Sequence, residues 1–157
     1  MSPVTSLLFC GTGGQGVLTA AEVCGWAALR AGFHVKKSEV HGMAQRGGSV
    51  ESHLRFGEEV FSPLIPDGGA DFLIPFHAEE ENRLAHFLKP GGQNLIASLA
   101  DASKLEDRKF VNTYLLGVLS ARMELAREHW VEALKIVYRG RRIEENIRYF
   151  ELGAGKK

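Results

Sequence analysis

The fold is decided by residues 4–16, VTSLLFCGTGGQG, in which a short apolar run stops at a cluster of glycines. The apolar part, residues 4–10, predicts a buried strand, and the glycines predict a tight turn after it. Small and apolar residues then recur at three-to-four spacing from Val17 to Ala31, which predicts a helix that ends at Gly32. A strand, a turn and a helix open a βαβ unit, for which a right-handed crossover and a parallel sheet are the default.

Four segments downstream predict further strands: residues 33–40, 49–56, 70–76 and 93–97. Residues 49–56 alternate apolar and polar side chains, so we expect one solvent-facing polar side, which carries Glu51, His53 and Arg55. A turn at residues 57–59 leads into residues 60–63 and predicts a hairpin.

The last third of the chain is predicted to be helical, because apolar residues recur there at helical spacing. The three expected helical faces carry Leu116, Leu119, Met123 and Ala126, then Trp130, Leu134 and Val137, then Ile143, Ile147 and Phe150. The whole pattern predicts an α/β fold over residues 1–157: a single-domain, Rossmann-like sandwich with a mostly parallel sheet, a hairpin and C-terminal helices.

Composition narrows the classes of function. The 157 residues are 45% apolar and 24% charged, as in ordinary globular proteins. The 19 basic residues balance the 19 acidic ones, so no global positive field attracts nucleic acid or an anionic membrane. There is no signal-peptide pattern and no apolar run of about 18 to 20 residues that would span a membrane. We therefore expect a cytoplasmic protein without a nucleic-acid or membrane partner.

The two cysteines, Cys10 and Cys24, stand 14 residues apart in apolar segments. Zinc and iron–sulfur sites need about four ligands, commonly in closely spaced pairs. We expect both thiols to be small buried hydrophobic groups, and we expect this chain to hold no metal or cluster by itself.

The first candidate site is the glycine turn, residues 11–16, which satisfies the pattern G-x-G-x-x-G between a strand and a helix. Amide groups and the helix N-terminus could hold a phosphate there, or the glycines could serve only the tight turn, and the two interpretations have equal weight. If the turn binds a nucleotide, Glu39, which lies 23 residues after Gly16, is the acidic residue expected to bind the ribose hydroxyl groups. The candidate cofactor-binding residues in the turn are Gly11, Thr12, Gly13, Gly14, Gln15 and Gly16.

The second candidate site is the stretch SEVHGMAQRGG at residues 38–48, at the carboxyl end of a predicted strand, where α/β proteins bind ligands. Its glycines leave the larger side chains free to face a ligand or a second subunit, and Arg46 suits a phosphate or a carboxylate. The alternative is a solvated loop with one surface arginine. The candidate residues here are Glu39, His41, Gln45, Arg46, Gly47 and Gly48.

These two stretches, together with RFG at 55–57 and SPLIP at 62–66, resemble the gamma-type domain of the 2-oxoacid:ferredoxin oxidoreductases. The form VHGMAQRGG at 40–48 resembles the small (beta) subunit of the indolepyruvate branch, whereas pyruvate-type relatives carry Y-G-P-E-x-R-G-G there. The resemblance extends through NTYLLGVL at 112–119 to Asn146, Phe150 and Gly153. One departure is the short segment 98–111, where the family has a longer stretch with a further strand and helix.

The resemblance implies an accessory subunit, inactive alone, of an enzyme that oxidatively decarboxylates an arylpyruvate. Coenzyme A would be the co-substrate, bound at a shared cleft. The larger partner subunit would carry thiamine diphosphate, magnesium and iron–sulfur clusters, and ferredoxin would take the electrons. Two alternatives stay open: a gamma subunit acting on pyruvate, 2-oxoglutarate or a branched 2-oxoacid, and a free-standing nucleotide-binding module that uses the glycine turn.

Overall fold

Five strands form one mixed sheet in the computed structural model, which describes residues 4–41 and 48–155. The strands are β1 (Val4–Thr12), β2 (His34–His41), β3 (Ser49–Gly57), β4 (Ala70–Pro75) and β5 (Leu88–Asn94). Their spatial order is β2-β3-β1-β4-β5. The neighbours β1, β4 and β5 are parallel, and β3 is antiparallel to both β1 and β2. Four strands therefore run in one direction, which confirms the expected mostly parallel sheet.

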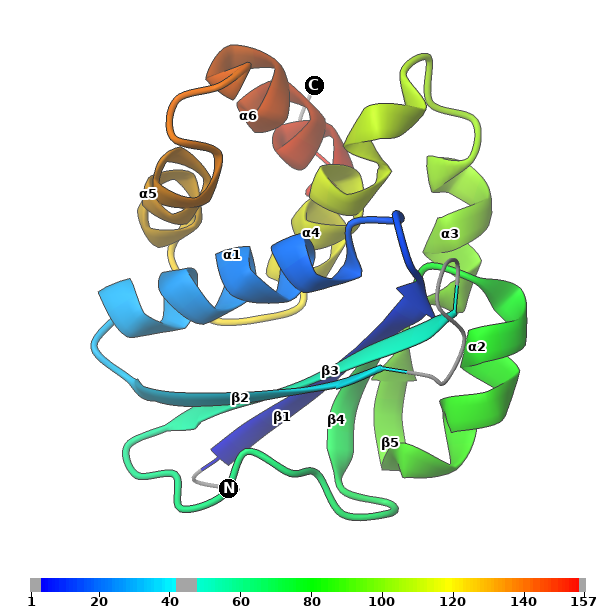
Figure 1. The fold of residues 1–157 in the computed structure, drawn as a ribbon. Coiled ribbons are helices and arrows are strands. Elements are labelled where there is room, and N and C mark those ends of the chain that lie inside the picture. The colour runs from blue at the N-terminus through cyan, green and yellow to red at the C-terminus, as the bar shows by residue number, and fades with distance from the viewer. Residues whose placement is uncertain (1–3, 42–47, 156–157) are drawn as a thin grey trace.

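Helices cover the two faces of the sheet unequally (Figure 1). α1 (Val17–Arg30) packs directly on one face, and α4 (Val111–Ser120), α5 (Arg127–Tyr138) and α6 (Ile143–Gly153) lie over it. The short helices α2 (Ala78–Leu84) and α3 (Ile96–Ala102) flank β4 and β5, and single 3-10 turns occupy Ala85–Phe87 and Arg108–Phe110. Among the helices in the described ranges, none combines the length and the apolar character that crossing a bilayer requires.

Alternate residues of β1 face two separate hydrophobic cores. Leu7 and Phe9 enter the large core under α1, α4, α5 and α6. Leu8 and Cys10 enter a small core on the opposite face with Ile65 and the α2 residue Leu84. The alternation follows from the two-residue period of a strand, and it explains why an unbroken apolar run is needed in a strand that is covered on both sides.

Positive-φ glycines mark both ends of α1, as the sequence predicts. Gly16 precedes the helix at φ 82°, and Gly32 follows it at φ 96°. After the helix, the amide of Phe33 donates to the carbonyl of Ala28 at 3.1 Å, which satisfies an otherwise open carbonyl of the last turn.

The predicted hairpin between residues 49–56 and 60–63 is wrong. β3 pairs along its length with β1 on one side and with β2 on the other, so no edge of β3 is free for residues 60–63. The antiparallel connection runs from β2 to β3 instead. Residues 58–69, which we call the strap, cross the sheet without forming a strand and lead from β3 to β4.

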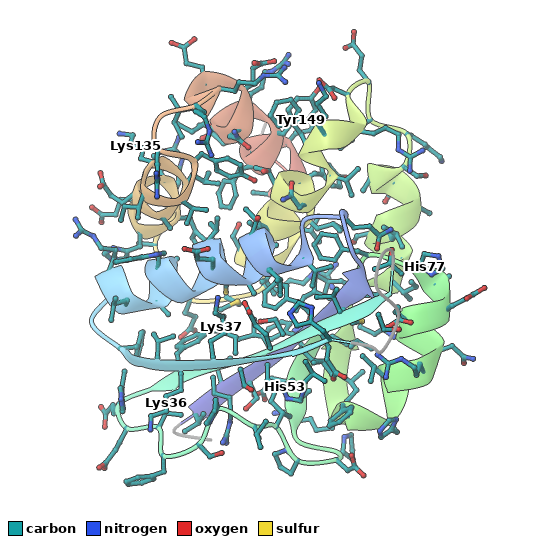
Figure 2. All side chains as sticks on the ribbon, in the orientation of Figure 1. Lys36, Lys37, His53, His77, Lys135 and Tyr149 are labelled. Carbon is teal, nitrogen blue, oxygen red and sulfur yellow. The ribbon has the colours of Figure 1, made fainter. Side chains whose placement is uncertain are left out.

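The polar side of β3 is also not solvated, contrary to expectation. Glu51 and His53 are only 8% and 4% exposed, because the strap and α2 cover them. His53 Nε2 lies 3.1 Å from Glu51 Oε2, and His53 Nδ1 accepts the amide of Ile65 at 3.2 Å. Figure 2 shows His53 on the face of the sheet that points away from α1. The imidazole and the carboxylate have hydrogen-bond partners within the protein. The alternation of apolar and polar residues along β3 therefore separates two buried faces rather than a buried face and a solvated one.

Two predicted boundaries also differ from the structure. β5 comprises Leu88–Asn94 rather than residues 93–97, and a helix begins at Ile96. Pairing with β4 recruits the earlier residues, and a register irregularity between Ala70 and Phe72 accommodates the Pro90 region at this sheet edge. α4 ends at Ser120, so Met123 and Ala126 lie in the following turn rather than on the helix.

Candidate functional site

The glycine turn lies at the carboxyl end of β1 and is stabilised by its own hydrogen bonds. The amide of Thr12 donates to Gln15 Oε1 at 2.7 Å, and the amide of Gln15 donates to the carbonyl of Thr12 at 3.3 Å. The amide of Gly13 donates to the carbonyl of Gly48 at 3.0 Å. An anion at the turn would therefore meet the Gly14 amide and the first turn of α1, whose amides have no partner four residues earlier.

The turn itself favours glycine at three of its positions, Gly11, Gly14 and Gly16. A Cβ at Gly11 would lie 2.7 Å from Gln15 Oε1, and a Cβ at Gly16 would lie 2.6 Å from Asn112 Nδ2. At Gly14 a Cβ would meet nothing within 4 Å, and glycine is favoured there by the left-handed φ of 88° instead. Close packing thus accounts for Gly11 and Gly16, whereas the open space beside Gly14 is where a ligand could approach.

Among the described residues, the second candidate stretch is joined to the glycine turn by the hydrogen bond from the Gly13 amide to the Gly48 carbonyl. Gln45, Arg46 and Gly47 lie outside the described residues. This contact brings the start of β3 to the end of β1.

Glu39 and His41 are exposed on β2, which β3 separates from β1 and the glycine turn. The Glu39 carboxylate pairs with Lys37 at 3.4 Å. Because β3 lies between β1 and β2, Glu39 is two strand spacings, about 10 Å, from β1. A nucleotide on the glycine turn would need its acidic partner on the adjacent parallel strand, so this topology does not support a ribose contact by Glu39.

A cavity of about 430 Å³ opens beside the glycine turn. Sequence analysis missed its far wall, where Arg108 and Lys109 are exposed and form no ion pair among the residues that the structure describes. Asp107 caps this short turn by accepting the amide of Lys109 at 3.0 Å. The only sequence signal was the run Asp-Arg-Lys before an apolar helix. The cavity is lined by Gly14, Gln15, Gly16, Phe76, Leu99, Ser103, Arg108, Lys109, Val111 and Asn112.

Asn112 connects the glycine turn to the C-terminal helices. Its Nδ2 donates to the carbonyl of Gly16 at 3.5 Å and to the Tyr138 hydroxyl at 3.3 Å. The neighbouring Thr113 hydroxyl donates to Asn146 Oδ1 at 2.8 Å. Asn112 thus supports the turn from 96 positions later in the chain, and Asn146 supports the neighbouring Thr113; both asparagines come from the motifs that carry the resemblance.

A buried ionic cluster lies where β3 begins, under α2. Glu80 accepts from the Ser49 hydroxyl at 2.9 Å and from Arg83 Nη2 at 2.8 Å, and Glu51 lies 3.8 Å from the same guanidinium. Burial alone would raise the pKa of the Glu80 carboxyl, but the hydrogen bonds from Arg83 and Ser49 outweigh it and hold the pKa below its ordinary value. The Glu80 carboxylate therefore stays charged at neutral pH, next to the half-exposed guanidinium of Arg83.

The two thiols are buried, and burial favours their protonated form over the thiolate that ligands and nucleophiles need. Burial raises the pKa of Cys10 to about 12, with a further contribution from the Glu80 carboxylate, and burial raises the pKa of Cys24 as well. The two residues belong to different cores on opposite faces of the sheet. Within the described ranges, no three His, Cys, Asp or Glu side chains come together as a metal site would need.

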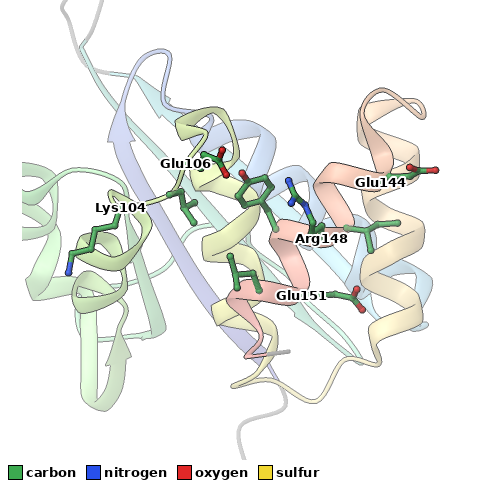
Figure 3. Close-up of a pocket in the computed structure, with 9 residues that line it drawn as sticks. Lys104, Glu106, Glu144, Arg148 and Glu151 are labelled. Carbon is green, nitrogen blue, oxygen red and sulfur yellow. The ribbon is translucent and has the colours of Figure 1, made fainter. Parts of the chain in front are cut away.

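A larger cavity, of about 540 Å³, lies between α6 and residues 104–106. Its charges are mixed and do not converge: Figure 3 shows Lys104 and Glu144 at opposite ends, pointing away from one another. Glu151 is already paired with Arg127 at 2.6 Å. We place the candidate site in the smaller cavity, because only there do cations without ion pairs among the described residues face a glycine-rich turn.

Residues 6–104 match the family model described as pyruvate ferredoxin/flavodoxin oxidoreductase. Over 94% of the chain and 93% of the relative, the sequence is 34% identical to "Indolepyruvate oxidoreductase subunit IorB" from Thermococcus kodakarensis. That alignment extends over 188 positions, more than the 157 residues of this chain, so it contains residues that the chain lacks.

Two solved structures share the fold. A 2-oxoglutarate:ferredoxin oxidoreductase from Magnetococcus marinus, with 2-oxoglutarate, coenzyme A and succinyl-CoA bound, aligns with a TM-score of 0.82 at 19% identity. This chain covers 31% of that longer one, and 99% of its own residues are aligned. The gamma subunit of a keto/oxoacid ferredoxin oxidoreductase from Geobacter sulfurreducens aligns over 99% of this chain and 97% of its own, with a TM-score of 0.77 and 21% identity.

Proposed function

Because the chain belongs to the pyruvate ferredoxin/flavodoxin oxidoreductase family, we propose that it is the accessory subunit of an indolepyruvate-type 2-oxoacid:ferredoxin oxidoreductase. The observation that carries this proposal is the 34% identity, over nearly the full length of both chains, to a subunit of that name. The reaction would convert an arylpyruvate and coenzyme A into an aryl-acetyl-CoA and carbon dioxide, with two electrons passed to ferredoxin.

The chemistry divides between the subunits according to their residues. Thiamine diphosphate and iron–sulfur clusters in the larger subunit would supply the electron sink and the electron path that oxidative decarboxylation needs. This chain offers buried, protonated thiols and no convergent ligand set among its described residues, which suits a subunit that binds and positions rather than one that carries redox groups.

The cavity beside the glycine turn is the proposed binding site for the phosphates of coenzyme A. Arg108 and Lys109 supply two positive charges to the lining, and Gly14, Gln15 and Gly16, just before the N-terminus of α1, line the same cavity. Asn112 holds the turn from behind through the Gly16 carbonyl. A polyanion placed in this cavity would meet both the cations and the amide donors.

The test uses the complex of this chain with its thiamine-bearing subunit. Arg108→Ala and Lys109→Ala should each raise the KM for coenzyme A about five- to tenfold and leave kcat nearly unchanged, because the lost contact is equal in ground and transition states. Calorimetric binding of coenzyme A to the same complexes gives a readout that is independent of turnover.

Lys135→Ala is the matched control, since Lys135 is an exposed lysine on α5, away from the cavity (Figure 2). If the Arg108→Ala/Lys109→Ala double variant binds coenzyme A as tightly as the control, the proposed phosphate site is wrong. Comparison of kcat/KM for indolepyruvate, pyruvate, 2-oxoglutarate and a branched 2-oxoacid decides the substrate. A higher value for any of the last three would replace the arylpyruvate assignment.

A further inference from the structure

The strap covers a face of the sheet that lacks the helical layers of the other face. On that side α2 and the strap pack against the small core, whereas α1, α4, α5 and α6 cover the opposite side (Figure 1). Sheets that are largely parallel usually have both faces fully covered. The face that the strap covers is therefore the more thinly covered face of the sheet.

Two imidazoles hold the strap from beneath. The amide of Val60 donates to His34 Nδ1 at 3.1 Å, and the amide of Ile65 donates to His53 Nδ1 at 3.2 Å. Val60 and Ile65 themselves point inward and are 1% and 3% exposed. These two residues fasten the strap to β2 and β3 at positions five residues apart.

Two cations hold the carbonyls between those positions. Lys36 Nζ donates to the carbonyl of Phe61 at 3.2 Å, and Arg55 Nη1 donates to the carbonyl of Ser62 at 3.0 Å. Pro63 further restricts the backbone, because its ring fixes its own φ and disfavours the helical conformation at the preceding residue, Ser62. The backbone around Phe61 is thus fixed by side chains from two strands, although it lies on the surface; Figure 2 shows Lys36 on this side of the sheet.

The side chains on this fixed backbone are apolar and point outward. Phe61 is 80% exposed and Leu64 is 55% exposed, the two largest values among the exposed large hydrophobic residues of the described chain. Pro66 beside them is exposed as well. A rigid backbone that presents an aromatic and an aliphatic side chain loses little conformational entropy on association, which is the arrangement of an interface anchor.

We propose that the strap is the docking surface for the larger, thiamine-bearing subunit, which receives Phe61 and Leu64 in an apolar pocket with a basic rim. This inference rests on the proposed function. The basic rim follows from the three acidic side chains of the strap, Glu58, Glu59 and Asp67, because the neighbouring cations Lys36 and Arg55 are already engaged with its backbone carbonyls. A second copy of this chain would bring the same three acidic residues against them, so charge complementarity favours a different partner.

The test compares Phe61→Ala and Leu64→Ala with wild type in binding to the thiamine-bearing subunit. Phe61→Ala should weaken the complex at least about 30-fold, and Leu64→Ala should weaken it several-fold. The melting temperature of the isolated chain should not change, because both side chains are exposed. Leu152→Ala is the control, since Leu152 is similarly exposed, at 47%, and belongs to α6, which covers the opposite face of the sheet (Figure 1).

If Phe61→Ala binds the thiamine-bearing subunit with the same affinity as wild type and Leu152→Ala, this inference is overturned and the proposed function stands. Failure of wild type itself to bind would instead overturn the proposed function, and the inference with it. If Phe61→Ala abolishes a self-association of the isolated chain while the heteromeric complex keeps its affinity, the strap contacts a second copy and the inference is wrong. Hydrogen exchange should also slow at residues 58–66 on complex formation.

Discussion

The Glu80 carboxylate shows at the residue scale how a buried charge couples stability to pH. Its pKa is lower in the folded chain because the hydrogen bonds from Arg83 and Ser49 outweigh its burial. A carboxyl of this kind stabilises the fold above its unfolded pKa of about 4.3, and the contribution disappears as the pH falls through the folded value. Glu80→Gln should therefore lower the free energy of unfolding by about 1–3 kcal/mol at pH 7. The difference in free energy between the variant and wild type should become smaller below about pH 4.

Urea denaturation at a series of pH values from 7 to 3 measures this difference. Glu79→Gln is the matched control, because Glu79 is exposed and also lies in the first turn of α2. A stability difference between Glu80→Gln and wild type that stays constant over the whole range would show that the charge of Glu80 has no role and that only the shape of the side chain matters.

At the scale of elements, α4 and α6 cross so closely that their backbones touch. A Cβ at Gly117 would lie 1.9 Å from the Phe150 carbonyl oxygen, and a Cβ at Gly153 would lie 2.0 Å from the Tyr114 carbonyl oxygen. Neither oxygen belongs to a flexible side chain that could move aside. Gly117→Ala should therefore destabilise the chain by at least about 2 kcal/mol, because the two helices must separate.

Gly25→Ala supplies a control with the opposite expected sign. Gly25 also lies inside a helix, α1, but a Cβ there would sit at an ordinary 3.5 Å from Leu54 Cδ1. Alanine stabilises a helix interior by roughly 0.5–1 kcal/mol relative to glycine. Thermal unfolding of both variants measures the two changes in stability. If Gly117→Ala is as stable as wild type, α4 and α6 pack less closely than the structure shows.

At the scale of the whole molecule, the isolated chain should be catalytically inert. Oxidative decarboxylation needs an electron sink and a redox carrier, and the buried thiols supply neither. We expect no 2-oxoacid-dependent dye reduction by the purified chain, even with thiamine diphosphate, magnesium and coenzyme A, and robust reduction once the thiamine-bearing subunit is added. Steady turnover by the single chain would remove the subunit assignment.

The sequence by itself determined the parts of this protein that depend on neighbouring residues. The strand, glycine turn and first helix follow from residues 4–32, because an apolar run and well-placed glycines act locally. The burial of both cysteines and the C-terminal helices α5 and α6 follow in the same way. The family followed from short motifs, of which the stretch at residues 40–48 is the most specific.

Only the tertiary structure decided which segments meet. Insertion of β3 between β1 and β2 moved Glu39 away from the glycine turn, and it left residues 60–63 to form the strap instead of a hairpin. Arg108 and Lys109 face the turn although they are more than 90 residues away in the chain. Alternation along β3 could not show that its polar side is buried, because a two-residue period assigns side chains to two faces but does not say what covers each face. Strand order and long-range packing depend on contacts between distant residues, which local periodicity does not contain.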